Sequence, residues 1–453
     1  MMDQPTLFEL PGERVQAAEA PLAGKPRLRM AERHQVIVRT LALDQMLPQD
    51  DEARTVWEFV CQCDLSALLQ RIRAVEGAVG HPPADPRILL ALWLLATLRG
   101  VGSARELARL CERHLAYQWL CGEVTMNHHT LGDFRVQHAA LVDNLLTQSI
   151  AALLQAGAVK LQRVAQDGVR TRASAGKSSF RSRPRLEQFL AEAREQVERL
   201  KREIEEDPNA ASRREIAAKQ RAAQERLQRV EEALVACAEV QALKEKRGGD
   251  SLKTPARGST TDPDARIMKM ADGGFRPAYN IQFATDTQSQ VIVGVDVTTQ
   301  GTDAGQLAPM VEQIEGRTGI RPPDLLVDGG YSTRDEIQKL NDPERGYKVY
   351  APVKEEEKQR AKGQDPFAPR PGDPPQLTEW RTRMGTEEAK LIYKERAATA
   401  ECVNALARQR GLQQLRVRGQ DKARTVAVWF ALAHNLRRWA VLRADLVITT
   451  RYS

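Results

Sequence analysis

Two aspartates and one glutamate stand where their carboxylates could act together. Asp167 follows the segment 159–166, which is predicted to be a strand, and Asp328 follows the short apolar run 325–327, which is predicted to be a buried strand. The carboxyl ends of strands in an α/β sheet are where ligands bind. Glu401 lies inside a long predicted helix and, taken alone, would be an ordinary residue on a helix surface.

Carboxylates that converge repel one another unless cations hold them together. Their hard oxygen atoms suit Mg²⁺ or Mn²⁺. Two such ions, about 3.5 to 4 Å apart, stabilise both the attacking and the leaving oxygen of an in-line phosphoryl displacement. The chemistry that these residue types favour is therefore metal-assisted phosphoryl transfer, with Asp167, Asp328 and Glu401 as catalytic and metal-binding residues.

The elements around these residues follow one another in a recognisable order. Apolar and polar residues alternate over 279–283 and again over 291–297, which predicts a β-hairpin. The later segments are predicted as a helix at 303–317, the strand before Asp328, a helix at 334–340, a strand at 347–353 and a helix at 387–410. This order predicts an α/β fold with a ribonuclease-H-like mixed sheet and helices on both faces.

Further segments precede and interrupt this sheet. Residues 36–138 have a helical pattern, with Ser103 and Thr130 each followed three residues later by an acid, as in a capping box. Near-heptad apolar spacing predicts an antiparallel helical hairpin that is structural in role. The predicted units are a flexible arm at 1–30, an all-α DNA-binding domain at 31–150, a catalytic domain at 157–183 and 250–442, and the hairpin insertion at 184–246.

Composition narrows the class of protein. The 453 residues include 42% hydrophobic and 28% charged residues and carry a net charge of +7, which makes an acidic partner such as nucleic acid plausible. The six cysteines have no paired CxxC spacing, so neither a disulfide framework nor a zinc site is predicted. The sequence shows no signal peptide, and its longest apolar run, 88–98, is about half a membrane span. A cytoplasmic protein without membrane contact is expected.

Several motifs resemble insertion-sequence transposases of the DDE superfamily. They are the run 164–171 around Asp167, the block 261–282, and the run 327–331 around Asp328. A further motif resembles the Tyr, Arg, Glu, Lys signature of the superfamily and here reads Tyr393, Arg396, Glu401, Arg408. The stretch 127–135 is similar to an N-terminal domain that accompanies such transposases. The similar stretches span roughly residues 75 to 440.

The resemblance implies a DNA transposase that depends on Mg²⁺ or Mn²⁺. Asp167, Asp328 and Glu401 would hold the metal, and Arg170, Tyr393, Arg396 and Arg408 would contact DNA. Its partners would be double-stranded DNA, as the terminal repeats of an element and as target, and further copies of the chain in a homo-oligomer at the nucleoid. The chain departs from the family at Arg408, where Lys is usual, and at 402–404, where aromatic and glycine residues are common.

Other functions fit the same residues. A metal-dependent nuclease of the same fold would cut DNA without joining it. An inactive, domesticated copy would act only as a DNA-binding protein. The basic bias between Arg408 and Arg438 fits a track for a DNA backbone, although it would equally be a solvated face in an unrelated protein. His128 and His129 have no third ligand nearby in sequence, so a structural role is expected for them.

Overall fold

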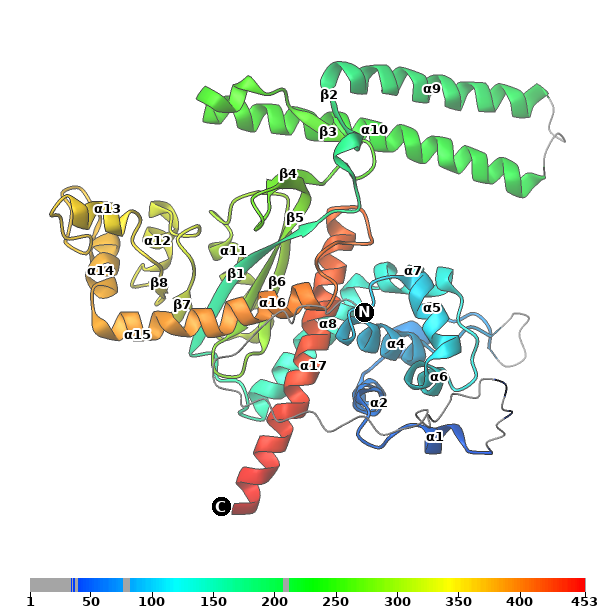
Figure 1. The fold of residues 1–453 in the computed structure, drawn as a ribbon, viewed down its shortest axis with the longest axis horizontal. Helices are drawn as coiled ribbons and strands as arrows, with labels where there is room; N and C mark the ends of the chain where they lie inside the picture. The colour runs from blue at the N-terminus through cyan, green and yellow to red at the C-terminus, as the bar shows by residue number, and fades with distance from the viewer. Residues whose placement is uncertain (1–33, 35, 37–39, 76–81, 207–211, 453) are drawn as a thin grey trace, which may run out of the picture. The chain divides into compact units, whose positions relative to one another are not determined.

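The computed structural model describes residues 34, 36, 40–75, 82–206 and 212–452, and the predicted arm at 1–30 lies outside the described residues. The residues from Leu43 onward belong to one unit, drawn as a ribbon in Figure 1. None of the helices in the described ranges is long and apolar enough to cross a membrane.

A six-stranded mixed sheet carries the two aspartates. Its strands are β1 (Arg163–Arg172), β4 (Arg266–Lys269), β5 (Phe275–Asp286), β6 (Ile292–Thr298), β7 (Asp324–Leu326) and β8 (Lys348–Tyr350). β5 pairs antiparallel with β1 along one edge and with β4 and β6 along the other. β1, β7 and β8 run parallel. The order β6-β5-β1-β7-β8 is the ribonuclease-H-like arrangement, so the predicted fold class is confirmed.

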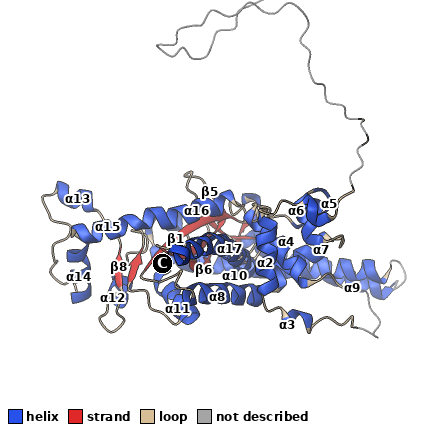
Figure 2. Ribbon diagram, turned by 90° about the horizontal axis from the view of Figure 1, so that it is seen from below, coloured by secondary structure: helices blue, strands red, loops and turns tan. Residues whose placement is uncertain are grey.

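Helices cover both faces of this sheet, as Figure 2 shows with α15 and α16 on one side and α11 on the other. These helices are α11 (Leu307–Thr318), α12 (Arg334–Leu340), α15 (Glu387–Arg396), α16 (Cys402–Gln409) and α17 (Gln420–Tyr452). α11 packs so closely on β6 that a side chain at Gly294 would lie 2.5 Å from the sulfur of Met310. α17 packs through Phe430, whose ring centroid is 5.3 Å from that of Phe283 on β5.

A long helical hairpin follows β1. It consists of α9 (Arg183–Glu206) and α10 (Arg213–Arg247), joined to the sheet through β2 (Phe180–Ser182) and β3 (Arg257–Ser259). The two helices lie side by side and present mostly exposed, charged residues. Their buried contacts are few and small, with Leu186 and Ala233 fully covered, which is what near-heptad spacing between two helices produces.

The N-terminal part of this unit is entirely helical. Its helices are α1 (Leu43–Met46), α2 (Glu52–Gln62), α3 (Ser66–Leu69), α4 (Pro86–Leu98), α5 (Ala104–Arg113), α6 (Leu115–Cys121), α7 (His128–Gln137) and α8 (Ala139–Gln155). α4 is buried along nearly its whole length because it packs against α2, α6 and α17. Ser103 caps α5 as predicted, whereas α7 begins earlier than predicted, with Asn127 rather than Thr130 as its cap.

Three predictions of local structure are wrong in instructive ways. The strand before Asp167 does not end there, since β1 runs on to Arg172. The segment 354–385, predicted as a flexible excursion, contains α13 (Glu356–Ala361) and α14 (Pro375–Met384). The long helix predicted at 387–410 is interrupted, because a π-helical turn at Ala397–Glu401 separates α15 from α16.

Candidate active site

Asp167 lies on β1, and Asp328 follows the end of the neighbouring parallel strand β7 by two residues. Ala165 on β1 is level with Leu326 on β7. Two residues further along each chain stand Asp167 and Asp328, so continuing the register places the two aspartates side by side. Strands are about 4.8 Å apart. The structure thus brings together the two aspartates selected from the sequence, although Asp167 lies in the middle of its strand and not at the end.

The charge of Asp167 is poorly tolerated at this position. Burial raises the pKa of Asp167 to about 6, from 3.8 for an ordinary aspartate, and the neighbouring charges of Asp328 and Asp303 add to the rise. The Arg396 guanidinium and the backbone N–H of Gly168 act in the opposite direction. The site is therefore rich in negative charge, and only part of that charge is neutralised by the protein itself.

Glu401 joins the aspartates through Arg396. One guanidinium nitrogen of Arg396 lies 3.4 Å from Oδ2 of Asp167, and the other lies 3.2 Å from Oε1 of Glu401. Residues five apart point in different directions on an α-helix. The π-helical turn, in which hydrogen bonds join residues five apart, brings Arg396 and Glu401 onto one face. The Arg163–Glu395 ion pair, at 2.6 Å, ties this part of α15 to β1.

Asp303 is a fourth carboxylate near the two aspartates, on the face of β1 opposite Asp167, and no motif in the sequence points to it. It lies in the loop before α11 and accepts hydrogen bonds at Oδ1 from the side-chain amides of Asn280 and Gln282, at 2.7 and 2.8 Å. Its other oxygen is 3.6 Å from Arg170. The sequence gives no signal for it, because a lone Asp in a polar loop is ordinary; only the fold brings it next to Gly168.

Gly168 makes room for these polar groups. A side chain there would begin 2.5 Å from Oδ1 of Asp303 and 2.5 Å from Nε2 of Gln282. Gln282 also accepts hydrogen bonds at Oε1 from the buried hydroxyl of Tyr331 and from the amide of Gln166. Tyr331 follows Asp328 by three residues. The network therefore links the strand of Asp167 with the loop of Asp328.

The predicted DNA-contacting residues have different surroundings. Arg170 is three residues after Asp167, so the pleat of β1 turns it to the opposite face, where it pairs with Asp303 and donates to the carbonyl of Gly301. The Tyr393 ring lies against Arg396, 5.8 Å from the guanidinium carbon, and supports its position. Arg408 is exposed and lines two surface hollows. The structure thus shows Arg408 open to a ligand, while Arg170 and Arg396 are engaged within the protein.

Three adjoining hollows form a path that we call the cationic groove. The first, of about 300 Å³, includes Gly168 and Arg170 and shares Arg172 and Arg408 with the second, of about 430 Å³. The third, of about 460 Å³, shares Ser103 and Arg416 with the second. The groove leads from the catalytic strand to α5 and α7. Backbone pairing between Arg172 and Gln414 holds its two sides together.

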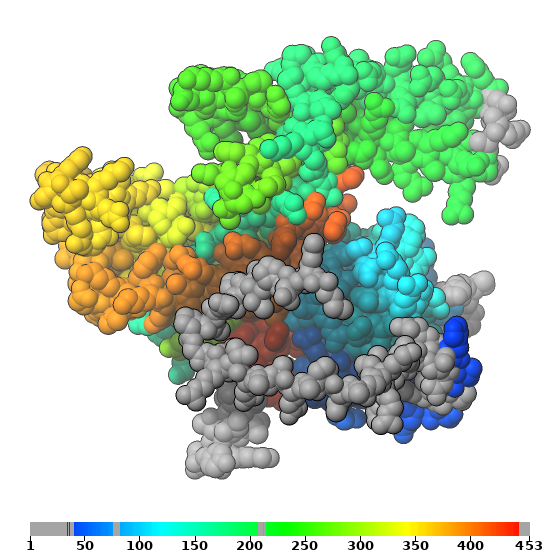
Figure 3. All heavy atoms as spheres, in the orientation of Figure 1, coloured from blue at the N-terminus to red at the C-terminus, as the bar shows by residue number. Residues whose placement is uncertain are grey.

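Most cations of the groove have no acidic partner. Within the described ranges, no ion pair involves the exposed cations of this path, which are Arg105, Arg172, Arg408, Arg416, Arg418 and Lys422. Arg276 is compensated, because it pairs with Asp272 at 2.7 Å. A row of free, exposed cations is what contact with a phosphate backbone requires. Figure 3 shows α15 and α16, in orange, at the molecular surface.

Asp167, Asp328 and Glu401 are not close enough together to form a ready-made metal site, and the part of the chain that the structure describes contains no other group of three or more His, Cys, Asp or Glu side chains placed to hold one ion. His128 and His129 stack on each other, with ring centroids 4.1 Å apart. All six cysteines are free thiols.

Comparison with protein families agrees with this geometry. Residues 41–137 match the family described as a transposase domain (DUF772), and residues 250–436 match the transposase DDE domain. The chain belongs to the insertion-sequence transposases of the DDE superfamily. The DDE match contains Asp303, Asp328 and Glu401. Asp167 precedes the matched segment, and the pairing of β1 with β5 and β7 brings it next to that segment. No curated protein and no solved structure matches the chain.

Both matched segments of the transposase contribute to the surface described above. The cationic groove passes from Arg408, in the DDE match, to Ser103 and Arg105, in the N-terminal match. DNA is the substrate that the family implies, and cutting and joining of DNA strands is the activity that it implies.

Proposed function

We propose that this transposase cleaves DNA at the ends of an insertion sequence and transfers the freed strands into target DNA, with Asp167, Asp328 and Glu401 as the catalytic carboxylates. The observation that carries the proposal is that Asp167 and Asp328 each follow the paired residues Ala165 and Leu326 by two positions, beside a helical turn that presents Glu401 through Arg396.

The side chains fit Mg²⁺ or Mn²⁺ in their chemistry. Asp167, Asp328 and Glu401 supply hard oxygen donors, and the pKa of Asp167 is raised by burial and by negative neighbours whose repulsion a divalent cation would relieve. Mg²⁺ commonly takes only one or two carboxylates and completes its shell with waters and substrate phosphates, so a closed protein cage is not needed. Such an ion, when bound, stabilises charge on the attacking and leaving oxygens.

The remaining residues of the site orient carboxylates and DNA. Arg396 holds Glu401 toward Asp167, and Tyr393 supports Arg396. Arg408 has no acidic partner among the described residues and is our candidate for a phosphate contact next to the carboxylates. Its planar guanidinium can bind a phosphate with two parallel hydrogen bonds, which the lysine usual at this position cannot do.

We further propose a division of labour along the chain. The helices of 31–150 and the cationic groove bind the terminal repeats, the catalytic domain at 157–183 and 250–442 also receives target DNA, and the hairpin at 184–246 is structural. Because two element ends must be held together for transfer, the active form is a homo-oligomer on DNA, working in the cytoplasm at the nucleoid.

The test is a cleavage and strand-transfer assay on DNA that spans the boundaries of the encoding element, with Mg²⁺ or Mn²⁺. We expect both activities in the intact protein and neither in Asp328→Asn. Asp296→Asn is a matched control, because Asp296 is an exposed carboxylate of the same sheet paired with Arg424 at 3.2 Å. Its activity should be unchanged.

Other outcomes would support a different function. Cleavage without joining, with every arrangement of ends, would indicate a nuclease. DNA binding without either reaction, in both metals, would indicate an inactive copy that works as a DNA-binding protein.

A further inference from the structure

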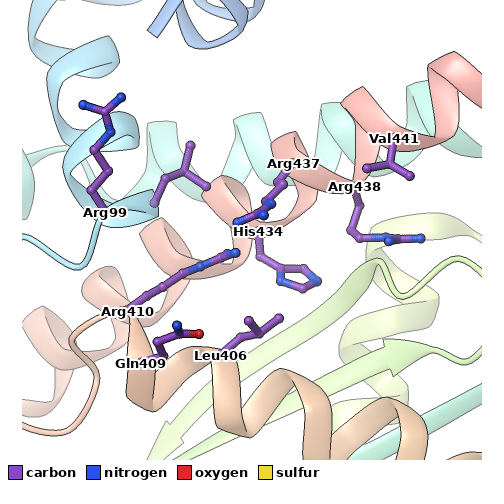
Figure 4. A pocket seen from close by; sticks show the side chains of 9 residues that line it. Arg99, Leu406, Gln409, Arg410, His434, Arg437, Arg438 and Val441 are labelled. Carbon is purple, nitrogen blue, oxygen red and sulfur yellow. The ribbon is translucent and has the colours of Figure 1, made fainter. Parts of the chain in front are cut away.

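A second concentration of arginines surrounds a separate hollow, on the other side of α16 from the first part of the cationic groove. This hollow has a volume of about 490 Å³ and lies between the end of α4, the end of α16 and the middle of α17. Its polar lining, labelled in Figure 4, consists of Arg99, Gln409, Arg410, His434, Arg437 and Arg438. Four guanidinium groups in one hollow would repel one another unless each is compensated.

Two of the four have partners within the protein, which are acidic for Arg99 and a backbone carbonyl for Arg438. Arg99 lies 3.3 Å from a carboxylate oxygen of Asp51 and 3.7 Å from one of Glu52. Arg438 donates through Nε to the backbone carbonyl of Ser289, at 2.8 Å.

Arg410 and Arg437 are not compensated. In the close view of Figure 4 their side chains point toward each other, one from the end of α16 and one from α17. Nη1 of Arg410 is buried and has no hydrogen-bond partner, and within the described ranges neither arginine forms an ion pair. Burial, and then the charge of Arg437, lowers the pKa of Arg410. A buried guanidinium nitrogen without a hydrogen-bond partner is costly, and a second cation facing it increases that cost.

His434 does not relieve this excess of positive charge. Its ring nitrogen Nε2 is 2.8 Å from the carbonyl oxygen of Gln290. Burial, together with the nearby arginines, lowers the pKa of His434 to about 4, so it is neutral at physiological pH. Arg410 also lies at the carboxyl end of α16, where the helix dipole favours a cation, but this effect extends only over the last turn and does not account for Arg437.

The backbone around Arg410 holds it firmly in this place. The end of α4 meets the end of α16 at Gly100 and Gly411, both of which have positive φ. A side chain at Gly411 would begin 3.0 Å from the carbonyl oxygen of Gly100, and one at Gly100 would begin 3.3 Å from Cα of Arg410. The two helices can approach this closely only with glycine at both positions. The backbone of Arg410 is thus held in a close junction between α4 and α16.

We propose that Arg410 and Arg437 together bind a backbone phosphate of the DNA whose scissile phosphodiester lies at Asp167 and Asp328. This inference rests on the proposed function. Arg410 follows Glu401 by nine residues, which corresponds to about 13 Å along a helix, or about four base pairs of duplex. Gln409 lines both this pocket and the cationic groove, so a continuous DNA backbone can reach the two. A backbone phosphate carries a negative charge on two non-bridging oxygens, and each oxygen can accept hydrogen bonds from one of the two guanidinium groups.

The experiment compares DNA binding by three proteins, all carrying Asp328→Asn so that no cleavage occurs. They are the otherwise intact chain, Arg410→Gln/Arg437→Gln, and the control Lys358→Gln/Arg360→Gln. The control removes the same charge from α13, where both cations are already paired with glutamates. Affinity for element-end DNA is measured by fluorescence anisotropy over a range of salt concentrations.

We expect the pocket variant to bind about tenfold more weakly than the control, with a salt slope smaller by about one to two. Its melting temperature without DNA should be unchanged or higher, because uncompensated cations have been removed. If Arg410→Gln/Arg437→Gln unfolds instead, the DNA affinity and salt slope of the single variant Arg437→Gln test the proposal, since Arg437 is exposed and is not needed for folding.

Each other outcome has a distinct meaning. Equal affinity and equal salt slope in the pocket variant and the control would overturn the pocket assignment and leave the proposed function standing. Loss of DNA binding in all three proteins would overturn the proposed function itself. A different result is that inorganic pyrophosphate stabilises the chain with Arg410 and Arg437 intact but not Arg410→Gln/Arg437→Gln, while both bind DNA equally. That result would assign the pocket to a free phosphate and overturn its assignment to DNA.

Discussion

Asp167 is held where its charge is unfavourable, so Asp167→Asn is expected to stabilise the transposase in the absence of metal ions while it abolishes cleavage. The pKa of Asp167 is raised from 3.8 to about 6, and its side chain is only 19% exposed. This difference corresponds to about 3 kcal/mol of destabilisation at pH 7.5, where the carboxylate is ionised. Asparagine resembles the neutral acid in shape and can still accept the hydrogen bond from Gly168.

The sign of the pH dependence follows from the raised pKa. Stability contributed by neutral Asp167 is fully present below about pH 4 and is lost as the pH rises through about 6. The difference in free energy of unfolding between Asp167→Asn and wild type should therefore be near zero at pH 4. It should grow between pH 4 and 6 and stay constant above pH 7. His434 titrates in the opposite sense over a similar range, but it is present in both proteins and cancels in the difference.

Thermal and urea unfolding in EDTA, followed by circular dichroism, measure this gap. A rise in melting temperature on the order of 5 °C is expected at pH 7.5. Saturating Mg²⁺ should narrow the gap, because binding stabilises the wild type by about 2.7 kcal/mol at a hundred times its dissociation constant. Asp296→Asn is the control and should show no gain. A variant no more stable than wild type at pH 7.5, or a gap that persists at pH 4, would refute the reasoning.

Further predictions follow from the same site and from the helix beside it. Gly168→Ala should abolish cleavage and lower the free energy of unfolding in urea by about 1 to 3 kcal/mol, because its methyl group would lie 2.5 Å from Asp303 and Gln282. Retained cleavage would show that these side chains can move aside. Asp303→Asn should slow cleavage about tenfold and raise the Mg²⁺ concentration needed for half-maximal rate, with DNA affinity unchanged in an anisotropy titration. His434→Asn should reduce the loss of stability on acidification, which in wild type begins below pH 6.5 and continues through about pH 4. Unfolding free energies measured at pH 7.5 and 4.5 check this, and an equal loss in variant and wild type would contradict it.

The sheet was predictable because its strands carry local signals. Alternating apolar residues over 279–283 and 291–297 have the period of a strand with one buried face, and β5 and β6 form there. The short apolar run before Asp328 forms β7 as expected. Asp328 and Glu401 could be selected because motif order and spacing supplied what each residue alone did not.

The predictions failed where distant contacts override local preference. Asp167-Gly168 has the composition of a turn, yet β1 continues because Phe283 and Gln282 of β5 pair with these two residues. The proline and glycine content of 354–385 predicted a loop, but α14 forms there because Leu377 and Trp380 are buried and Arg381 pairs with the buried Asp373 at 2.7 Å.

Asp303 shows the limit of reasoning from motifs. It lies in a loop more than a hundred residues from Asp167, and nothing in its immediate sequence distinguishes it from a loop aspartate that caps a turn. Its importance depends on three facts of the fold: the absent side chain at Gly168, and the two amides that Asn280 and Gln282 extend from β5.

The interrupted helix explains how Glu401 can serve a site that straight-helix geometry would not place it near. With 3.6 residues per turn, Glu401 would be turned well over 100° away from Arg396, and one guanidinium could not reach both Glu401 and Asp167. The extra residue of the π-helical turn at Ala397–Glu401 removes this offset. It also changes the direction of everything that follows on α16, including Arg408 and Arg410. The same π-helical turn therefore positions Glu401 and sets the direction of the arginines proposed to bind DNA. It links the proposed catalytic carboxylates to the proposed DNA-binding surface.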